Sequence, residues 1–474
     1  MKALDSVQRF GQLTVVALVA ALATACAPPI TLTAPPGPTS SQMVATPAFS
    51  PTGGTFTTDQ SVSISIATAG AAIYYTTDGT VPTTSSNLYA GPIPVQGNGI
   101  LKNIIAIGVL SGSSNSGLAA VSYKISHAIS TVAGNGTSGF SGDGGAATSA
   151  QFYYPAGMAV DGSGNYYVAD PYNHRVRKVS AIGTITTIAG SGVNGLMVAG
   201  AATSSPMEYP VAVALDSTAT NLYIADVAAN AVYKVLLSGP TISLFAGSAT
   251  GVSGFSGNGG AATSALLANP SGVAVSSSGN VYIADTGNNV VRVVAGGNIG
   301  PFAGNQAAGA GFSGDGSASG LAQLSGPQGV AVDSTGRVYI ADTGNNRVRR
   351  VSTLSVITTV AGGPSSNPYW QDGGIATSSN INGIAAVATD SSGNFYLTTY
   401  GNVLKVDPAG YLWDMAGFTN YNGSWPPPLG DGGPAASAYV QLTSYYYYPS
   451  GIAVDSSGSI YISDTYNYRI RKVQ

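Results

Sequence analysis

Aspartates in a recurring glycine-rich motif are the residues of this chain whose type and spacing most suggest chemistry. Four such segments place the aspartate before one or two glycines, at Asp143, Asp315, Asp372 and Asp431. Carboxylate oxygens are preferred ligands of Ca²⁺, so these segments could form calcium sites, and no other cofactor is indicated. Each segment offers one carboxylate to a cation that takes about six to eight oxygen ligands. We therefore favour turn-forming glycines with a capping aspartate.

A second series of aspartates ends a short apolar stretch and is followed five residues later by an arginine. The pairs are Asp170 with Arg175, Asp342 with Arg347 and Asp464 with Arg469. A carboxylate beside a guanidinium could bind a polar ligand, or it could join neighbouring turns of the protein. Because the pair returns with the repeats of the sequence, we favour the structural role.

Groups that could carry out catalysis are sparse. The chain has two histidines, His127 and His174, which are too few for a histidine-rich metal site. No Gly-x-Ser-x-Gly segment provides a nucleophilic serine for His174 to activate. The sequence therefore favours binding over catalysis.

One sequence motif recurs six times after residue 128, and the structural elements that it forms must position these side chains. It is clearest from Gly326 to Val351 and is followed by Ile357 to Gly362. Apolar residues alternate in four stretches of each unit, which predicts four short strands. The second stretch ends at Asp170, Asp226, Asp285, Asp342 and Asp464, with Thr399 in the fifth unit, at intervals of 56 to 65 residues. Such a period is typical of the blades of a β-propeller.

The two ends of the repeat region predict how the ring closes. The sixth unit stops at Gln474, one strand short, and an unpaired stretch from Ile129 to Gly134 precedes the first unit. We expect residues 129–474 to form a six-bladed propeller in which this leading strand completes the last blade, because both open edges are then paired. Segments 155–161, 167–170 and 173–179 resemble the NHL-repeat family, and that resemblance implies a β-propeller.

Loops and turns of such a blade predict a binding face. In an antiparallel meander, the long loop before the first strand and the turn after the second lie on the same side. This side would be polar and rich in tyrosine, and we predict that it binds a protein or a glycan. The candidate residues are Tyr153, Tyr154, Tyr209, Tyr445, Tyr446, Tyr447, Tyr448 and Asn346. The Tyr-Pro before a first strand could instead pack between blades.

The alternative function is a metal-dependent lyase or lactonase-like hydrolase acting in the central channel. It requires carboxylates where the first strands enter the channel. Small residues occupy those positions instead, namely Gly157, Ala212, Gly272, Gly329, Ala386 and Gly451.

A different pattern precedes the propeller. Residues 46–126 contain alternating stretches such as 61–66 and 72–76, which predict the strands of a small β-sandwich. The segment Tyr75-Thr-Thr-Asp-Gly-Thr-Val-Pro-Thr83 and its surroundings resemble the chitobiase/β-hexosaminidase C-terminal-type domain, an immunoglobulin-like module. The resemblance does not imply hexosaminidase activity. We favour a spacer role over glycan contact through Tyr74, Tyr75 or Tyr89, because alternate aromatic residues in a strand usually form one face of a core.

The first residues indicate export from a bacterial cell. Lys2 and Arg9 precede a 13-residue apolar run, so residues 1–25 are predicted to be a signal peptide. The sequence before Cys26, the single cysteine, resembles a lipobox, which implies lipidation of Cys26 and anchoring at the outer membrane or cell surface. An ordinary secretory signal is the alternative. Residues 26–45, rich in proline, serine and threonine, are predicted to form a tether.

Charge and composition limit the partners. Charged residues make up 8% of the chain and its formal net charge is -3, so no basic field is available for a nucleic acid. With 64 glycines and 26 prolines, the composition favours an all-β protein with many tight turns. We expect a monomer that contacts the membrane through its N-terminal lipid alone.

Overall fold

The computed structural model describes residues 43–96, 101–364, 370–417, 429–442 and 449–474. Strands and short 3-10 helices make up the regular structure of these ranges, which confirms the all-β class. The chain divides into two compact units. The predicted signal peptide, Cys26, nearly all of the tether, and Tyr445 to Tyr448 lie outside the described residues.

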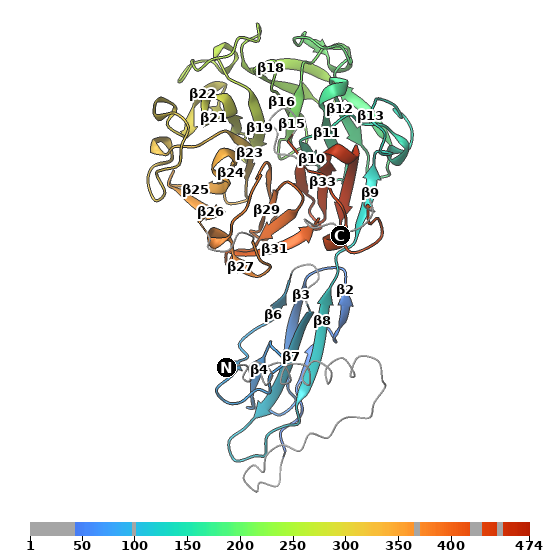
Figure 1. Cartoon of the computed structure of the whole chain (residues 1–474), viewed down its shortest axis with the longest axis vertical. Coiled ribbons are helices and arrows are strands. Elements are labelled where there is room, and N and C mark those ends of the chain that lie inside the picture. Colours follow the sequence, from blue (N-terminus) through green and yellow to red (C-terminus); the bar gives the residue numbers. More distant parts are fainter. Residues whose placement is uncertain (1–42, 97–100, 365–369, 418–428, 443–448) are drawn as a thin grey trace, which may run out of the picture. The chain divides into compact units, whose positions relative to one another are not determined.

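Two sheets form a small sandwich in the N-terminal part of the chain (Figure 1). One contains β1 (Ala48–Ser50), β3 (Gln60–Ser65) and β6 (Ile93–Val95), and the other contains β2 (Gly54–Phe56), β8 (Ala119–Ile125), β7 (Leu101–Val109), β4 (Ala72–Thr76) and β5 (Asn87–Leu88). Alternate side chains of β3 are buried, as the alternating sequence predicts, with Val62 and Ile64 in the core.

The remaining described residues form six sheets, which we call blades 1 to 6 in chain order. Blade 1 contains β10 (Met158–Val160), β11 (Tyr166–Asp170), β12 (Arg175–Val179) and β13 (Ile185–Ala189). Blade 2 contains β15 (Pro210–Leu215), β16 (Asn221–Asp226), β17 (Ala231–Leu236) and β18 (Thr241–Gly247). Blade 3 contains β19 (Pro270–Val275), β20 (Val281–Asp285), β21 (Val290–Ala295) and β22 (Asn298–Ala303). Blade 4 contains β23 (Pro327–Val332), β24 (Val338–Asp342), β25 (Arg347–Val351) and β26 (Ile357–Ala361), and blade 5 contains β28 (Val387–Thr389), β29 (Phe395–Thr398), β30 (Val403–Val406) and β31 (Tyr411–Ala416). Short strands β14 (Gly200–Ala201) and β27 (Gly374–Ile375) extend blades 2 and 5.

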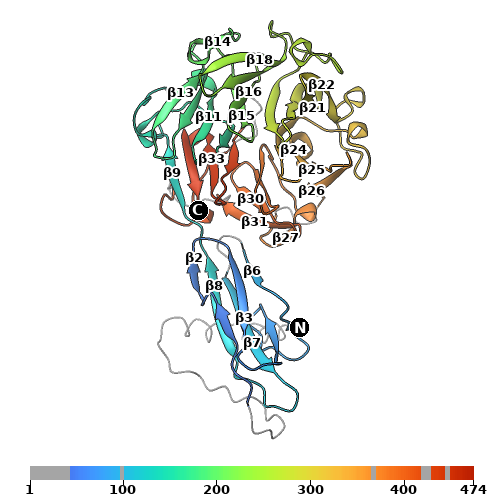
Figure 2. The ribbon, with the colours of Figure 1, turned by 180° about the vertical axis from the view of Figure 1, so that it is seen from behind.

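Blade 6 is completed from the far end of the sequence. It contains β32 (Ile452–Val454), β33 (Ile460–Asp464) and β34 (Arg469–Val473), and its outer strand is β9 (Ile129–Ala133). Strand β9 pairs antiparallel with β34, and Ile129 lies opposite Val473. The first strands of successive blades contact one another, and β32 of blade 6 contacts β10 of blade 1, so the ring is closed (Figures 1 and 2). The predicted closure by the leading strand is confirmed.

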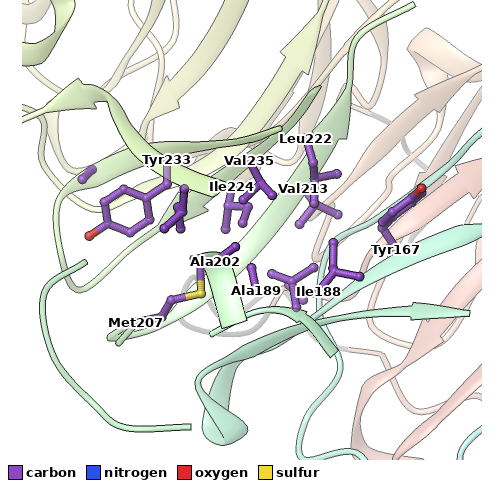
Figure 3. Packing of buried hydrophobic residues seen from close by; sticks show 14 of the residues in the cluster. Tyr167, Ile188, Ala189, Ala202, Met207, Val213, Leu222, Ile224, Tyr233 and Val235 are labelled. Atoms are coloured by element: carbon purple, nitrogen blue, oxygen red, sulfur yellow. The ribbon is translucent and has the colours of Figure 1, made fainter. Parts of the chain in front are cut away.

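Apolar side chains fill the space between neighbouring blades. Between blades 1 and 2, Tyr167 and Ile188 of one sheet pack against Val213, Leu222 and Ile224 of the next (Figure 3). Similar clusters join blades 2 and 3, and blades 3 and 4. Each blade thus depends on both neighbours for burial of its two faces.

Strand β9 should contribute to the stability of the whole ring. The side chain of Ile129 is fully buried among residues of blades 5 and 6. We predict that Ile129→Ala lowers the free energy of unfolding by about 2–5 kcal/mol, the usual cost of truncating a buried isoleucine. Urea denaturation followed by intrinsic fluorescence measures the change. The neighbouring exposed Ser130 provides the control Ser130→Ala, and equal stability of the two variants would contradict the role of β9.

Candidate binding face

A buried aspartate organises the same side of the ring in five of the six blades. It ends the second strand of each blade and accepts a hydrogen bond from a backbone N–H of the segment that precedes the first strand. The donors are Tyr153 to Asp170, Tyr209 to Asp226, Ala268 to Asp285, Ser325 to Asp342 and Gln441 to Asp464, at 2.7–2.9 Å. In blade 5 Thr399 occupies the aspartate position, and its hydroxyl accepts from Asn402 N–H within the same turn. The aspartate therefore fastens the long loop to the turn.

The arginine partner of this aspartate is not the one that the sequence suggested. In blade 1 the guanidinium of Arg177, not Arg175, lies 3.6 Å from the carboxylate of Asp170. Arg175 lies opposite Asp170 in the strand register, but its guanidinium stacks on Phe140 and donates to the carbonyls of Asn173 and Ser191. The same correction applies to Asp342, which pairs with Arg349, and to Asp464, which pairs with Arg471.

The aspartates of the glycine-rich motif complete this arrangement. Asp143, Asp315 and Asp431 each accept a hydrogen bond of 2.8 Å from the buried arginine of their blade. A threonine hydroxyl of the outer strand donates to the second carboxylate oxygen, as Thr187 does to Asp143. These carboxylates bond to side chains of other strands, so the expectation of a local capping role was wrong. Three of the four calcium candidates are thus already paired with a cation.

Burial controls the titration of the inner aspartates. It raises the pKa of Asp342 to about 6, and hydrogen bonds from Ser325 and Asn345 together with the Arg349 guanidinium oppose that shift. The side chains of Asp342 and Arg349 have no exposed surface. An ion pair of this kind costs desolvation, so its main effect is to penalise the loss of either partner.

Asp372, the fourth calcium candidate, has a different environment. Leu404 occupies the repeat position of the buried arginine in blade 5, and Asp414 replaces the threonine of the outer strand. The backbone N–H of Asp414 donates to Asp372 at 2.6 Å. Burial and the nearby carboxylate of Asp372 raise the pKa of Asp414 well above its usual value. Blade 5 thus has two neighbouring carboxyl groups where blades 1, 4 and 6 have one carboxylate paired with an arginine.

The long loops and the turns after second strands do lie on one side. Asn173 of the turn in blade 1 donates to the carbonyl of Gly139 in the preceding loop, and Asn345 bonds in the same way to Gly311. Asn346, a predicted binding residue, has a left-handed backbone and its side-chain oxygen accepts from Gly383 N–H. Its amide therefore joins blades 4 and 5.

Tyrosines from three blades gather on this face. The rings of Tyr153 and Tyr154 stack with centroids 5.1 Å apart, and Tyr172 lies 4.8 Å from Tyr153. Tyr209 of blade 2 contacts Tyr172 at 5.0 Å. We call the group Tyr153, Tyr154, Tyr172, Tyr209, Tyr466 and Tyr468 the tyrosine cluster. None of its residues is buried, and Tyr172 is 38% exposed.

Three members of the cluster were absent from the sequence prediction. Tyr172, Tyr466 and Tyr468 stand in the turns after the second strands of blades 1 and 6. The corresponding turns of blades 3 and 4 read Thr-Gly-Asn-Asn, at 286–289 and 343–346. The replacement of glycine and asparagine by tyrosine at a repeated position is the signal that could have identified them.

The centre of the tyrosine cluster is Tyr154. Its backbone is left-handed, with φ of 57°, which is uncommon for an aromatic residue. A hydrogen bond with Tyr468 and burial raise the pKa of Tyr154 to about 12. Tyr468 itself has φ of 54°. Blades 1 and 6 are thus joined at this face by contacts between unusual turn residues.

Small, apolar and uncharged polar residues line the axis of the ring. Gly157, Gly272, Gly329 and Gly451 lie where first strands meet, and a Cβ atom on Gly272 would stand 2.0 Å from the carbonyl oxygen of Gln328. A ring of apolar side chains follows, formed by Met158, Val213, Val273, Val330, Val387 and Ile452. The cavity at the glycine level has a volume of about 60 Å³ and no carboxylate in its lining.

The described ranges contain no group of three or more histidine, cysteine, aspartate or glutamate side chains arranged to hold a metal ion. Across the same part of the chain, no helix has the length and hydropathy needed to span a bilayer.

Family models match both parts of the chain. Residues 51–118 match the chitobiase/beta-hexosaminidase C-terminal domain. Residues 324–351 and 446–473 match the NHL repeat, and residues 129–198 and 192–295 match the teneurin NHL domain. The chain is an NHL-repeat β-propeller protein. Its N-terminal sandwich is a chitobiase C-terminal-type domain.

Curated relatives of the NHL-repeat protein share part of its propeller. Teneurin-3 of Mus musculus is 32% identical over 237 residues, which cover 44% of this chain and 8% of the relative. The protein SUPPRESSOR OF QUENCHING 1 of Arabidopsis thaliana is 27% identical over 248 residues, covering 48% of this chain and 22% of the relative. The chain thus spans only a small share of these relatives.

Solved structures resemble the NHL-repeat protein over most of its length. A protein of unknown function from Bacteroides thetaiotaomicron has a TM-score of 0.53 and 18% identity, covering 91% of this chain and 98% of that one. An auxiliary nutrient binding protein from Bacteroides ovatus has a TM-score of 0.51 and 14% identity, covering 92% and 98%. At these identities the likeness shows the fold alone.

The buried arginine of the NHL-repeat blades should be costly to remove. We predict that Arg349→Leu destabilises the protein by about 3–5 kcal/mol, because Asp342 is left buried without its counter-charge. Adding Asp342→Asn should recover at least about 1 kcal/mol, since it removes that charge. Chemical denaturation measures the free energy of unfolding of the single and the double variant. The control is Arg347→Leu on the same strand, for which we expect a smaller loss of stability. A loss below that of the control would contradict the proposed pairing.

The carboxyl pair of blade 5 should make the stability depend on pH. The pKa of Asp414 is raised in the folded protein, so its favourable contribution is complete below about pH 4 and is lost as the pH rises through the folded pKa. Asp414→Thr, which introduces the residue found in other blades, should raise the melting temperature by about 1–4 °C at pH 7.5. At pH 4 the two proteins should melt together. A pH-independent difference would contradict this account.

Proposed function

We propose that this protein is a non-catalytic binding protein that holds a glycan on the loop-rich face of its propeller. The tyrosine cluster is the observation that carries the proposal. Six tyrosines from three blades lie within 6.2 Å of a neighbouring ring centroid, and none of them is buried. Rigid loops held by the buried aspartates position them.

Several properties of the cluster suit a carbohydrate. A tyrosine ring offers an apolar face to the C–H groups of a sugar, and its hydroxyl can exchange hydrogen bonds with sugar hydroxyls. Charge on the chain is low, which favours a neutral ligand over a nucleic acid. A protein ligand is the second class that an exposed tyrosine cluster can bind, because tyrosine is also enriched at protein interfaces.

We place the protein at the bacterial cell surface in this proposal. The N-terminal sequence supports export, and lipidation of Cys26 would anchor the chain, with the residues that follow as a tether. The sandwich would act as a spacer. The auxiliary nutrient binding protein with a similar fold is consistent with capture of a nutrient glycan at an envelope.

The channel enzyme has less support from the described residues. The cavity where first strands meet is lined by glycine, alanine, apolar and uncharged polar residues such as Ser271 and Gln328, and its lining has no carboxylate, imidazole or thiolate. At the opposite end of the axis, Asp161 and Asp216 line the channel, but each accepts hydrogen bonds from its own turn. The described residues that line the axis thus gather no set of ligands for a divalent metal ion.

Removal of an exposed ring should weaken glycan binding. We predict that Tyr172→Ala reduces affinity for a glycan selected on an array of bacterial and plant polysaccharides by at least about tenfold, equal to about 1.4 kcal/mol. Tyr411→Ala is the control, because Tyr411 is 44% exposed and begins the outer strand of blade 5, outside the cluster. Affinity is measured by isothermal titration calorimetry on folded variants.

Two results would count against the glycan proposal. One is equal loss of affinity in the Tyr172 and Tyr411 variants. The other is absence of binding to every polysaccharide on the array, which would favour a protein ligand.

A further inference from the structure

A second cavity lies between blades 4 and 5, at the ends of the strands away from the tyrosine cluster. Its volume is about 380 Å³, within the range of sites that bind small molecules. Arg337 stands just before β24, whereas Asp342 at the other end of that strand begins the loop-rich face. The cavity is therefore separate from the face to which we assign glycan binding.

Two arginines contribute to the lining of this cavity. Arg337 donates to the buried carboxylate of Asp333 at 2.6 Å. Arg350 forms no ion pair among the described residues. Its guanidinium donates a hydrogen bond to the hydroxyl of Tyr339. Burial raises the pKa of Tyr339, and the charges of Arg337 and Arg350 together with this hydrogen bond oppose the shift. A guanidinium with a neutral partner retains donors for an anionic ligand.

The rest of the lining combines aromatic, apolar and hydroxyl groups. The rings of Tyr339 and Phe395 meet with centroids 5.0 Å apart. Thr377 and Ser392 are exposed residues of the same lining. Asp407 also lines the cavity, but its two oxygens accept hydrogen bonds from Ala409 N–H, Tyr411 N–H and the Trp413 indole. Its carboxylate is thereby satisfied within its own turn.

The neighbouring cavity between blades 3 and 4 shows what is specific to this one. It has a volume of about 290 Å³ and is lined by serines, threonines and aromatic rings, with no charged residue. Val293 stands at the repeat position of Arg350, and Asn280 at that of Arg337. A cation at the Arg350 position is common in the repeat, because blades 1, 2, 5 and 6 carry a lysine there, namely Lys178, Lys234, Lys405 and Lys472. What is particular to blade 4 is an arginine at this position, together with Arg337.

We propose that the cavity between blades 4 and 5 binds a small hydroxylated carboxylate, of the size and chemistry of a single sugar acid. The Arg350 guanidinium receives the carboxylate, the hydroxyl-bearing residues bond to the ring hydroxyls, and Phe395 with Tyr339 contacts the apolar face of the ring. A planar guanidinium matches a carboxylate in a two-bond geometry that an ammonium group does not reproduce.

Calorimetric titration of the full chain with D-glucuronate tests the proposal, with D-glucose as the neutral equivalent and inorganic phosphate as the simple anion. We expect saturable binding of glucuronate, at least tenfold weaker binding of glucose, and a loss of glucuronate affinity of tenfold or more in Arg350→Gln. Arg350→Lys should retain part of the affinity. The matched control is Lys234→Gln, because Lys234 lies opposite Tyr223 in blade 2 as Arg350 lies opposite Tyr339 in blade 4.

Four outcomes would overturn the proposal. The first three are unchanged glucuronate affinity in Arg350→Gln, equal loss in Lys234→Gln, and absence of glucuronate binding in the unmodified protein. Phosphate binding as tight as glucuronate binding would reduce the site to a general anion site and also contradict the proposal. Tyr172→Ala should leave glucuronate binding intact, so failure of this inference and failure of the glycan proposal can be told apart.

Discussion

The loop-rich face of the propeller depends on a buried carboxylate that accepts backbone N–H groups. In five blades this aspartate fastens the segment before the first strand to the turn after the second. Asp226 does so without an arginine, accepting from Glu208, Tyr209 and Ala229. The backbone bonds are therefore the common element, and the arginine of four blades supplies the counter-charge that burial otherwise makes costly.

Departures from the repeat mark the places where chemistry differs from scaffolding. Blades 1 and 6 carry tyrosines at turn positions that are glycine or asparagine in blades 3 and 4, and these tyrosines meet across the closure of the ring. Blade 4 carries the arginine Arg350 where four other blades have lysine and blade 3 has valine. Blade 5 lacks both the aspartate and the arginine and has the Asp372 and Asp414 pair. Residues that recur in most blades stabilise the repeated fold, so a residue that differs in one blade indicates a role particular to that blade.

The periodicity of the sequence predicted much of the architecture but less of the candidate binding site. Four alternating stretches per unit and a spare leading strand were enough to predict blades closed by β9. Of the predicted binding residues, Tyr153, Tyr154 and Tyr209 lie in the tyrosine cluster, whereas the amide of Asn346 joins two blades. The arginine assignment failed because Arg175 is the register partner of Asp170, and the choice between it and Arg177 depends on side-chain packing around Phe140 and the loop.

Local information in the chain determined its strands, its turns and the number of units, because alternation and turn residues act over a few neighbours. The three-dimensional fold alone decided which side chains share a site. Tyr154 and Tyr468 are far apart in sequence but stand 5.3 Å apart, ring to ring, because the ring closes between blades 6 and 1. Arg350 and Phe395 line one cavity because successive blades pack face to face. Contacts of this kind depend on closure of the ring, which no single repeat encodes.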